Sequence, residues 1–250
     1  MTDGSVQNPF GYFGKLPTFG DFIHQVLPQD FANDFHRWLQ YSMAASREFL
    51  GEDFLPYYLN CPAWKFAASA GICGEQPVVG LTIPSVDRVG RYFNFTLATV
   101  LPMDTLPVSY VIANSFGFRE LEKAAIDILE ADYPREALEA KVSEIAMQFE
   151  AVETCQSQVT QELDHLRLFM GRPSQFADQS AVLLDHLLSA QSGNYSVWWY
   201  GQQGQNQSQM IVCEGMPSPE AYMHLLSQGG PLVQQEKEVN LIDQIIAGET

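Results

Sequence analysis

The spacing of hydrophobic residues predicts one long helix near the N-terminus. From Asp30 onward, aromatic and aliphatic residues recur every three or four positions, which is typical of an amphipathic helix over 31–50. Asp30 is placed to act as its N-cap, and Gly51 follows its last apolar residue. Before this helix, residues 11–23 contain three glycines and a proline among aromatic residues. That composition indicates a short strand followed by an ordered loop.

Three apolar segments with strand character follow the helix. They cover residues 64–70, 77–83 and 92–101 and are rich in β-branched and aromatic side chains. The connection between the first two is short enough for a hairpin, whereas parallel neighbours would need a longer crossover. We therefore expect an antiparallel sheet.

The second half of the chain begins with helical patterns. Two acidic helices are predicted over 117–131 and 135–150, separated at Pro134, because proline disfavours helical geometry in the residue before it. The tract 155–191 is also expected to be mostly helical, with its clearest apolar pattern near its end.

A second hairpin and a final helix complete the pattern. The apolar segments 195–200 and 208–214 flank a polar turn, and a helix is predicted over 218–226. The neighbouring residues Trp198 and Trp199 must point to opposite faces of their strand. The second face is therefore either covered by a helix or part of a contact surface.

Together these elements predict an α+β fold, with a mainly antiparallel β-sheet flanked by α-helices. A chain of 250 residues, of which 46% are hydrophobic, is long enough to bury a substantial core. We expect a single domain over 1–250, and sub-lobes of about 1–115 and 116–250 are compatible with the pattern.

The charge is strongly negative and unevenly distributed. The formal net charge is −17; residues 1–100 carry six basic and nine acidic side chains, and residues 101–250 carry seven and twenty-one. No local basic patch is visible in the sequence, so binding to nucleic acid or to an anionic membrane is disfavoured. A partner of the more acidic second part is expected to be basic.

Cysteine spacing and hydropathy indicate a cytoplasmic protein. The four cysteines form no CxxC pair, which disfavours a disulfide framework and a structural zinc site; they are Cys61, Cys73, Cys155 and Cys213. The N-terminus does not read as a signal peptide, and no apolar run is long enough to span a membrane. We expect no membrane insertion.

Known catalytic motifs are absent from the sequence. There is no GxSxG, P-loop, GxGxxG or HExxH pattern, and the five histidines are scattered. The many carboxylates of 117–150 are typical of the solvated faces of amphipathic helices. We therefore expect no catalytic residues, no cofactor and no metal ion.

The stretch "PSVDRVGRYF" at 84–93 is the most unusual polar segment. Arg88 and Arg91 lie three residues apart across Gly90, so both guanidinium groups would reach one carboxylate or phosphate if the loop turns there. Asp87 would instead satisfy one of them internally, and this structural brace is the favoured interpretation. The alternative is an enzyme that binds a small molecule or a phosphate through Asp87, Arg88 and Arg91.

Several motifs resemble one known family. The segments read "GYFGKLPTFGDFI" (11–23), "LTIPSVDRVGRYFNFTLA" (81–98) and "SVWWYGQQ" followed by "MIVCEGMPSPEAY", and in this order they resemble the TagF family associated with bacterial type VI secretion. The first two motifs are specific, and the resemblance spans nearly the whole chain. Asn94 stands where a proline is common in the family.

The resemblance implies a regulator and not an enzyme. Proteins of this family are cytoplasmic negative regulators that hold type VI secretion off post-translationally, by contact with the forkhead-associated-domain scaffold protein of the apparatus. The family offers no catalytic residues to transfer to this chain. A different class of function, a structural adaptor that acts through the acidic helices of 117–150 alone, also fits the sequence.

The motif loops 11–23 and 84–93 are expected to meet in one ordered patch. Both combine glycine and polar groups with aromatic residues. The polar members of this interaction or structural motif are predicted to be Lys15, Asp21, Asp87, Arg88 and Arg91.

Overall fold

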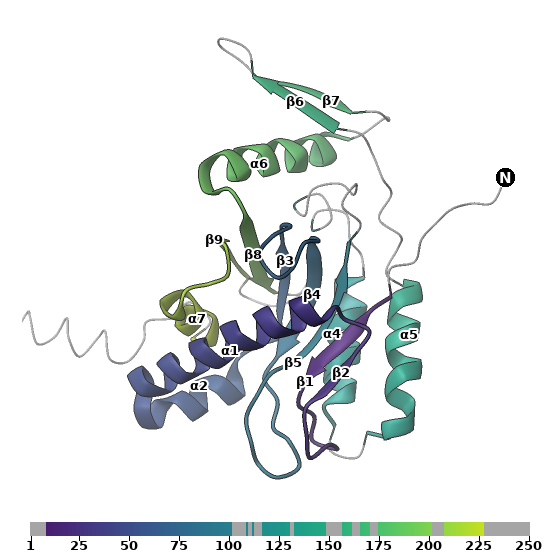
Figure 1. Cartoon of the computed structure of the whole chain (residues 1–250), viewed down its shortest axis with the longest axis vertical. Helices are drawn as coiled ribbons and strands as arrows, with labels where there is room; N and C mark the ends of the chain where they lie inside the picture. Colours follow the sequence, from purple (N-terminus) through teal and green to yellow (C-terminus); the bar gives the residue numbers. More distant parts are fainter. Residues whose placement is uncertain are drawn as a thin grey trace, which may run out of the picture.

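A seven-stranded antiparallel sheet forms the centre of the computed structural model, which describes residues 9–101, 109, 112, 117–130, 133–148, 157–161, 166–170, 175–201 and 208–227 (Figure 1). The strand order is β2-β1-β5-β4-β3-β8-β9, and each neighbouring pair is antiparallel. The predicted α+β fold, the predicted strands and the second hairpin are confirmed. The strands are β1 (Gly11–Gly14), β2 (Ile23–Gln25), β3 (Trp64–Ala68), β4 (Val78–Ile83), β5 (Phe95–Val100), β8 (Tyr195–Tyr200) and β9 (Gln209–Glu214).

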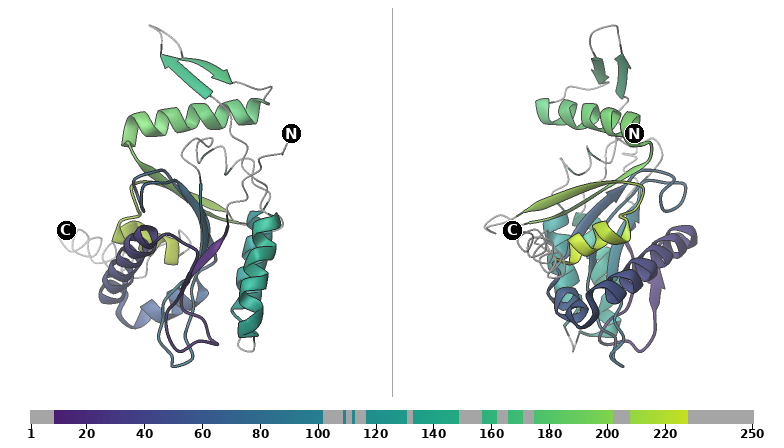
Figure 2. Two further views of the ribbon diagram at one scale, coloured as in Figure 1. Left: turned by 45° about the vertical axis from the view of Figure 1, so that its right-hand side comes forward. Right: turned by 90° about the vertical axis from the view of Figure 1, so that its left-hand side faces the viewer.

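Three helices cover one face of the sheet. They are α1 (Gln29–Leu50), α2 (Phe54–Asn60) and α7 (Pro219–Leu226), and Figure 2 shows α1 and α7 side by side on this face. The core beneath them is aromatic: Trp198 is fully buried and its ring lies 5.0 Å from those of Phe66 and Trp38. This packing holds α1 against the sheet along much of its length.

The ends of α1 differ in part from the prediction. The N-cap position is occupied by Pro28, and Asp30 lies in the first turn, where its carboxylate accepts a hydrogen bond from the N–H of Phe31 (2.8 Å). The predicted N-cap at Asp30 is therefore wrong, because the helix starts two residues earlier. Gly51 ends the helix as expected, with φ of 56°.

The opposite face is covered by α4 (Phe118–Ile128) and α5 (Leu138–Gln148), as Figure 2 shows in its left view. The core on this side is mainly aliphatic. Trp199 points to this side and its ring lies 4.8 Å from that of Phe118. Of the two alternatives for this face, cover by helices is the one found. Both predicted helices are found. The first ends at Ile128, before the predicted end at 131, and the second begins with a 3-10 turn over Arg135–Ala137; residues 131 and 149–150 lie outside the described residues.

One ion pair is buried between the sheet and α4. The Nζ atom of Lys65 on β3 lies 2.5 Å from Oε2 of Glu122 on α4, and these side chains are only 5% and 10% exposed. The pair lies where an aliphatic contact would otherwise be expected. It fixes which residues of the helix face the strand.

The prediction of a mostly helical tract over 155–191 is wrong in its first half. The antiparallel strands β6 (Ser157–Gln161) and β7 (Leu166–Met170) pair in its first half, and α6 (Phe176–Ser192) is the one helix among the residues of this tract that the structure describes. Apolar side chains at alternate positions of the hairpin, including Leu168 and Met170, pack on α6. This alternation is a strand pattern that the short, polar segment shows only weakly.

Candidate functional site

Two loops leave the sheet at the same end. Strand β5 lies between β1 and β4, and its first residue, Phe95, pairs with Gly14 on one side and Ile83 on the other. Residues 15–22, which follow β1, and residues 84–94, which join β4 to β5, therefore emerge next to one another. We call these two segments the loop junction; they lie at the lower end of the sheet in Figure 1.

Gly14 sets the direction in which the first loop leaves. Its φ is 127°, and a Cβ atom at this position would lie 2.0 Å from the carbonyl oxygen of Asn94. Only glycine allows both the conformation and this close approach. The side chain of Asn94 donates a hydrogen bond to Thr82 (3.1 Å), a contact that a proline at this position would not make.

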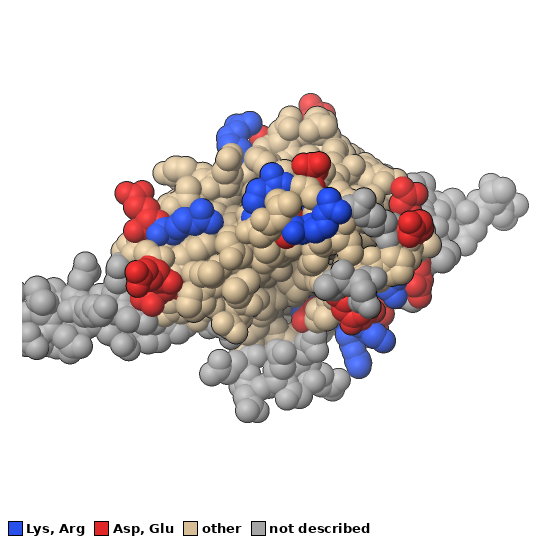
Figure 3. Space-filling model, turned by 90° about the horizontal axis from the view of Figure 1, so that it is seen from below, with Lys and Arg blue, Asp and Glu red and all other residues tan. Residues whose placement is uncertain are grey.

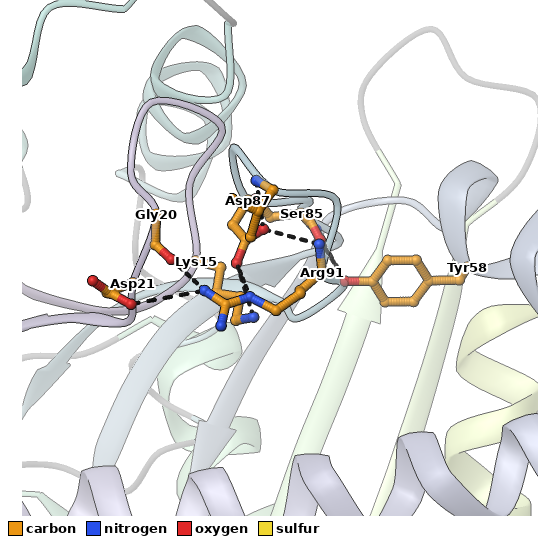
Figure 4. A network of polar contacts seen from close by, with 8 residues as sticks. Lys15, Gly20, Asp21, Tyr58, Ser85, Asp87 and Arg91 are labelled. Atoms are coloured by element: carbon orange, nitrogen blue, oxygen red, sulfur yellow. Dashed lines mark hydrogen bonds and ion pairs between the residues drawn. The ribbon is translucent and has the colours of Figure 1, made fainter.

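The carboxylate of Asp87 is the centre of the junction (Figure 4). Its Oδ1 accepts hydrogen bonds from the backbone N–H groups of Val89 (3.0 Å) and Arg91 (2.9 Å). Its Oδ2 accepts from Nζ of Lys15 (3.0 Å) and Nε of Arg91 (2.7 Å). The side chain of Asp87 is completely buried. Each carboxylate oxygen thus has two donors.

These donors keep Asp87 charged. Burial is the largest influence and by itself would raise the pKa of this carboxyl. The backbone N–H of Arg91, the ammonium group of Lys15, the guanidinium of Arg91 and the N–H of Val89 act in the opposite direction and together hold the pKa well below its ordinary value. Asp87 is therefore a fixed anion at neutral pH.

Arg91 connects the two loops. Its Nη2 donates to the carbonyl oxygen of Gly20 and lies 3.8 Å from Oδ1 of Asp21. The backbone N–H of Arg88 also donates across the junction, to the carbonyl of Phe19 (3.1 Å). The structure thus brings the two motif loops together. The carboxylate of Asp21 is 99% exposed, so its ion pair with Arg91 contributes little.

Arg88 does not join Arg91 on a common anion. Its side chain is exposed and makes no ion pair with any described residue, and a Cβ at Gly20 would lie 3.4 Å from its Nη2 atom. Of the five predicted motif residues, Lys15, Asp87 and Arg91 form one network, in which Lys15 and Asp87 are buried and Arg91 is about half exposed. Asp21 lies at its edge, and Arg88 faces solvent.

Tyr58 on α2 anchors residues 84–94, the second loop of the junction. The sequence did not predict this contact. The hydroxyl of Tyr58 donates to the carbonyl of Ser85 (3.0 Å) and accepts from the N–H of the same residue (3.1 Å), which ties α2 to the loop. Burial raises the pKa of Tyr58, so the phenol stays protonated. Burial likewise raises the pKa of the nearby Cys61 thiol to about 12, which disfavours the reactive thiolate.

The structure gathers basic side chains that are scattered in the sequence. Four of the six basic residues of 1–100 lie at or beside the junction: Lys15 and Arg91 in the network, Arg88 beside Gly20, and Arg47, which shares a pocket with Lys15. Figure 3 shows this end of the molecule with Lys and Arg side chains near the middle of the face. No run of basic residues signals this gathering, because the four come from three different segments.

Neither a metal centre nor a membrane span is found in the part of the chain that the structure describes. Within these residues, no three His, Cys, Asp or Glu side chains are grouped to hold a metal ion. None of the described helices combines the length and the apolar character needed to cross a membrane.

Comparison with known proteins gives a family and similar solved structures, of which one is described here. The family model described as "TagF N-terminal domain, Type VI secretion system-associated" matches residues 11–145. A crystal structure of PA0076 from Pseudomonas aeruginosa PAO1 is similar with a TM-score of 0.72 and 28% sequence identity, over 90% of this chain and 96% of that chain. A search of curated proteins gave no match. The matched segment 11–145 contains the whole loop junction, α1 and α2.

Proposed function

This chain belongs to the TagF family of type VI secretion-associated proteins, and from that premise we propose that it is a cytoplasmic negative regulator of type VI secretion. It acts post-translationally, by binding the forkhead-associated-domain scaffold protein of the apparatus, and it has no catalytic role. Repression of this kind requires only a stable surface that the partner recognises.

The observation that carries this proposal is the construction of the loop junction. A fully buried carboxylate with four donors fixes the backbone of both loops. Next to it, exposed side chains that suit protein recognition are presented: Arg88, Val89, which is 64% exposed, and Phe22, which is 44% exposed. Arginine and aromatic residues are enriched in the centres of interfaces, and a rigid backbone lowers the entropic cost of binding.

The alternative function, an enzyme with an anion clamp formed by Asp87, Arg88 and Arg91, has less support. Asp87 and Arg91 form hydrogen bonds with each other and with the backbone of the two loops. Of the two arginines, Arg88 is the one without an ion pair to a described residue. A clamp of two arginines on one external anion would require the network of Asp87 to open.

A pull-down with the forkhead-associated scaffold protein tests the proposal. Arg88→Glu reverses an exposed charge outside the buried network, so we expect at least about a tenfold loss of scaffold binding with an unchanged melting temperature. Arg119→Glu is the matched control. It reverses an exposed arginine on α4, which covers the face of the sheet opposite α1. If Arg88→Glu, Arg119→Glu and the wild type bind the scaffold equally well, the junction is not part of the interface.

The adaptor that acts through its acidic helices is tested in the same assay. Glu120→Lys on α4 and Glu144→Lys on α5 reverse exposed charges on these helices. We expect scaffold binding to survive both changes. Loss of binding with these variants, together with full binding by Arg88→Glu, would support the adaptor instead.

A further inference from the structure

A pocket lies between α1 and the loop junction. Its volume is about 280 Å³. One side is a single stripe of α1, and the other side comes from the two loops. The lining residues from α1 are His36, Gln40, Met43, Ala44 and Arg47; those from the loops are Lys15, Phe22, Tyr92 and Phe93.

Flat aromatic groups form much of the pocket wall. The rings of Phe22 and Phe93 lie 4.8 Å apart in an edge-to-face arrangement, and the ring of His36 stacks on Phe93 at 5.1 Å. Burial lowers the pKa of His36, so this imidazole is mainly neutral at pH 7. The wall therefore offers a planar, largely uncharged surface to a ligand.

Two cations line the same pocket, and none of the nine lining residues is acidic. The side chain of Lys15 is only 6% exposed, its Nζ donates to Asp87, and it lies 5.1 Å from the centre of the Phe22 ring. An ammonium group has three donors, so this contact to Asp87 leaves donors for a ligand. Arg47 lies toward solvent, with its guanidinium carbon 5.1 Å from the centre of the Phe54 ring.

The local charge is positive although the chain carries −17 overall. Asp87 is shared between Lys15 and Arg91, so the buried carboxylate does not neutralise both of them, and the other carboxylate near Arg91, that of Asp21, is exposed and does not line the pocket. Arg47 adds a further positive charge without a carboxylate in the pocket. A partly enclosed site with excess positive charge attracts anions more strongly than a surface lysine does.

We propose that this pocket binds a carboxylate or phosphate group carried on a short aromatic stem. Lys15 and Arg47 recognise the anion, and Phe22, Tyr92 and Phe93 pack against the stem. The volume exceeds that needed for a bare anion, and burial of a ring against aromatic walls adds favourable free energy. The proposal goes beyond the regulatory role, since scaffold binding through Arg88 does not require the pocket to be occupied, although Phe22 belongs to both surfaces.

Calorimetric titration of the full chain separates the contributions of charge and stem. The probes are phenyl phosphate, benzoate, inorganic phosphate and benzamide. We expect phenyl phosphate and benzoate to bind, with inorganic phosphate and the uncharged benzamide each at least about tenfold weaker. Equal affinity for inorganic phosphate would overturn the role of the stem, and equal affinity for benzamide would overturn anion recognition.

Variants on one helix locate the site. Arg47→Gln should weaken phenyl phosphate binding about tenfold, because one charged hydrogen-bond donor is lost. Arg37→Gln is the matched control: it removes the same charge from α1, but Arg37 is 78% exposed, pairs with Asp34 at 3.2 Å and does not line the pocket. If Arg47→Gln and Arg37→Gln bind phenyl phosphate with equal affinity, the anion does not bind at Arg47.

A substitution that fills the pocket with negative charge gives an independent test. Ala44→Glu introduces a carboxylate at an exposed lining position of a helix, where glutamate is well tolerated. We expect it to abolish phenyl phosphate binding while the melting temperature stays close to that of the wild type. Retained binding would overturn the assignment. Scaffold binding measured in parallel shows whether the regulatory proposal stands when the pocket proposal fails.

Discussion

Among the residues that the structure describes, two carboxylates are buried, and they are held in different ways. Asp87 joins two loops at the end of the sheet and accepts four hydrogen bonds. Glu122 joins α4 to β3 through one ion pair with Lys65, and its buried Oε2 makes no hydrogen bond of good geometry to a described residue. The first carboxylate accepts hydrogen bonds from two N–H groups of an irregular loop, whereas the second lies between a helix and a strand, which satisfy their own backbone groups. This difference predicts that apolar residues can replace Glu122 together with Lys65, whereas an apolar residue cannot replace Asp87.

The largest expected effect follows from removal of the first carboxylate. Asp87→Ala leaves the ammonium group of Lys15 buried without its partner and two loop N–H groups without an acceptor. We expect a loss of about 3–5 kcal/mol in the free energy of unfolding, measured by urea denaturation. Asp21→Ala in the same junction is the control, since that carboxylate is exposed and should change stability by less than about 0.5 kcal/mol. Similar losses for both variants would contradict this account.

The pH dependence of stability sharpens the same comparison. The pKa of Asp87 is lower in the native state than in the unfolded chain. The contribution of Asp87 to the free energy of unfolding is therefore complete above the ordinary carboxyl pKa of about 4. It is lost as the pH falls below that value, because the carboxyl takes up a proton in the unfolded chain at a higher pH than in the native state. The stability difference between the wild type and Asp87→Asn should be largest near neutral pH and shrink below about pH 4. A difference that stays constant down to pH 3 would be inconsistent with a stabilised carboxylate.

A smaller loss of stability is expected when Tyr58 loses its hydrogen bonds to the loop of residues 84–94. Tyr58→Phe leaves the N–H and C=O groups of Ser85 without their shared partner. We expect a loss of about 2 kcal/mol, measured by thermal denaturation, with the fold retained. Tyr57→Phe on the same helix is the control, because its hydroxyl makes no hydrogen bond to any described residue. An equal loss at both positions would assign the effect to packing.

The smallest effect is expected at the second carboxylate. The double variant Lys65→Met with Glu122→Leu replaces the buried ion pair by apolar side chains of similar size. Such replacements are often neutral or stabilising, so we expect a stability within about 1 kcal/mol of the wild type. The single variant Lys65→Met should be clearly less stable than the double variant, since it leaves a buried carboxylate unpaired. If the double variant is as unstable as Asp87→Ala, the two sites do not differ as proposed.

Elements with a strong periodic pattern could be predicted from the sequence. The helix over 31–50 and the strand over 195–200 carry enough buried residues to define their type. The β6–β7 hairpin was missed because its strands are short and only one side packs on α6, which leaves little hydrophobic signal. The short β2 and α2 were missed for a similar reason, since three residues of a strand and seven of a helix each give fewer than two full periods of the pattern.

The candidate site could be predicted where its contacts are local or where its residues belong to the two motif loops. The spacing of Asp87 and Arg91 allows an internal pair, and the structure contains one. Lys15 was identified through its motif. In contrast, Arg47 and Tyr58 reach the junction because α1 and α2 pack on the sheet, and nothing in their own neighbourhood in the sequence indicates this. Tertiary packing decides such contacts.

The pairing of β3 with β8 has a consequence for synthesis of the chain. Ala67 pairs with Val197, so 130 residues separate the two positions. At about 5–20 residues per second, a ribosome needs roughly 7–26 s to supply the second strand after the first. During that interval β3, whose five residues are all buried in the finished fold, has an open edge on one side. A nascent chain that stops before residue 195 therefore leaves one edge of β3 unpaired, and such an edge can pair with a strand of another chain.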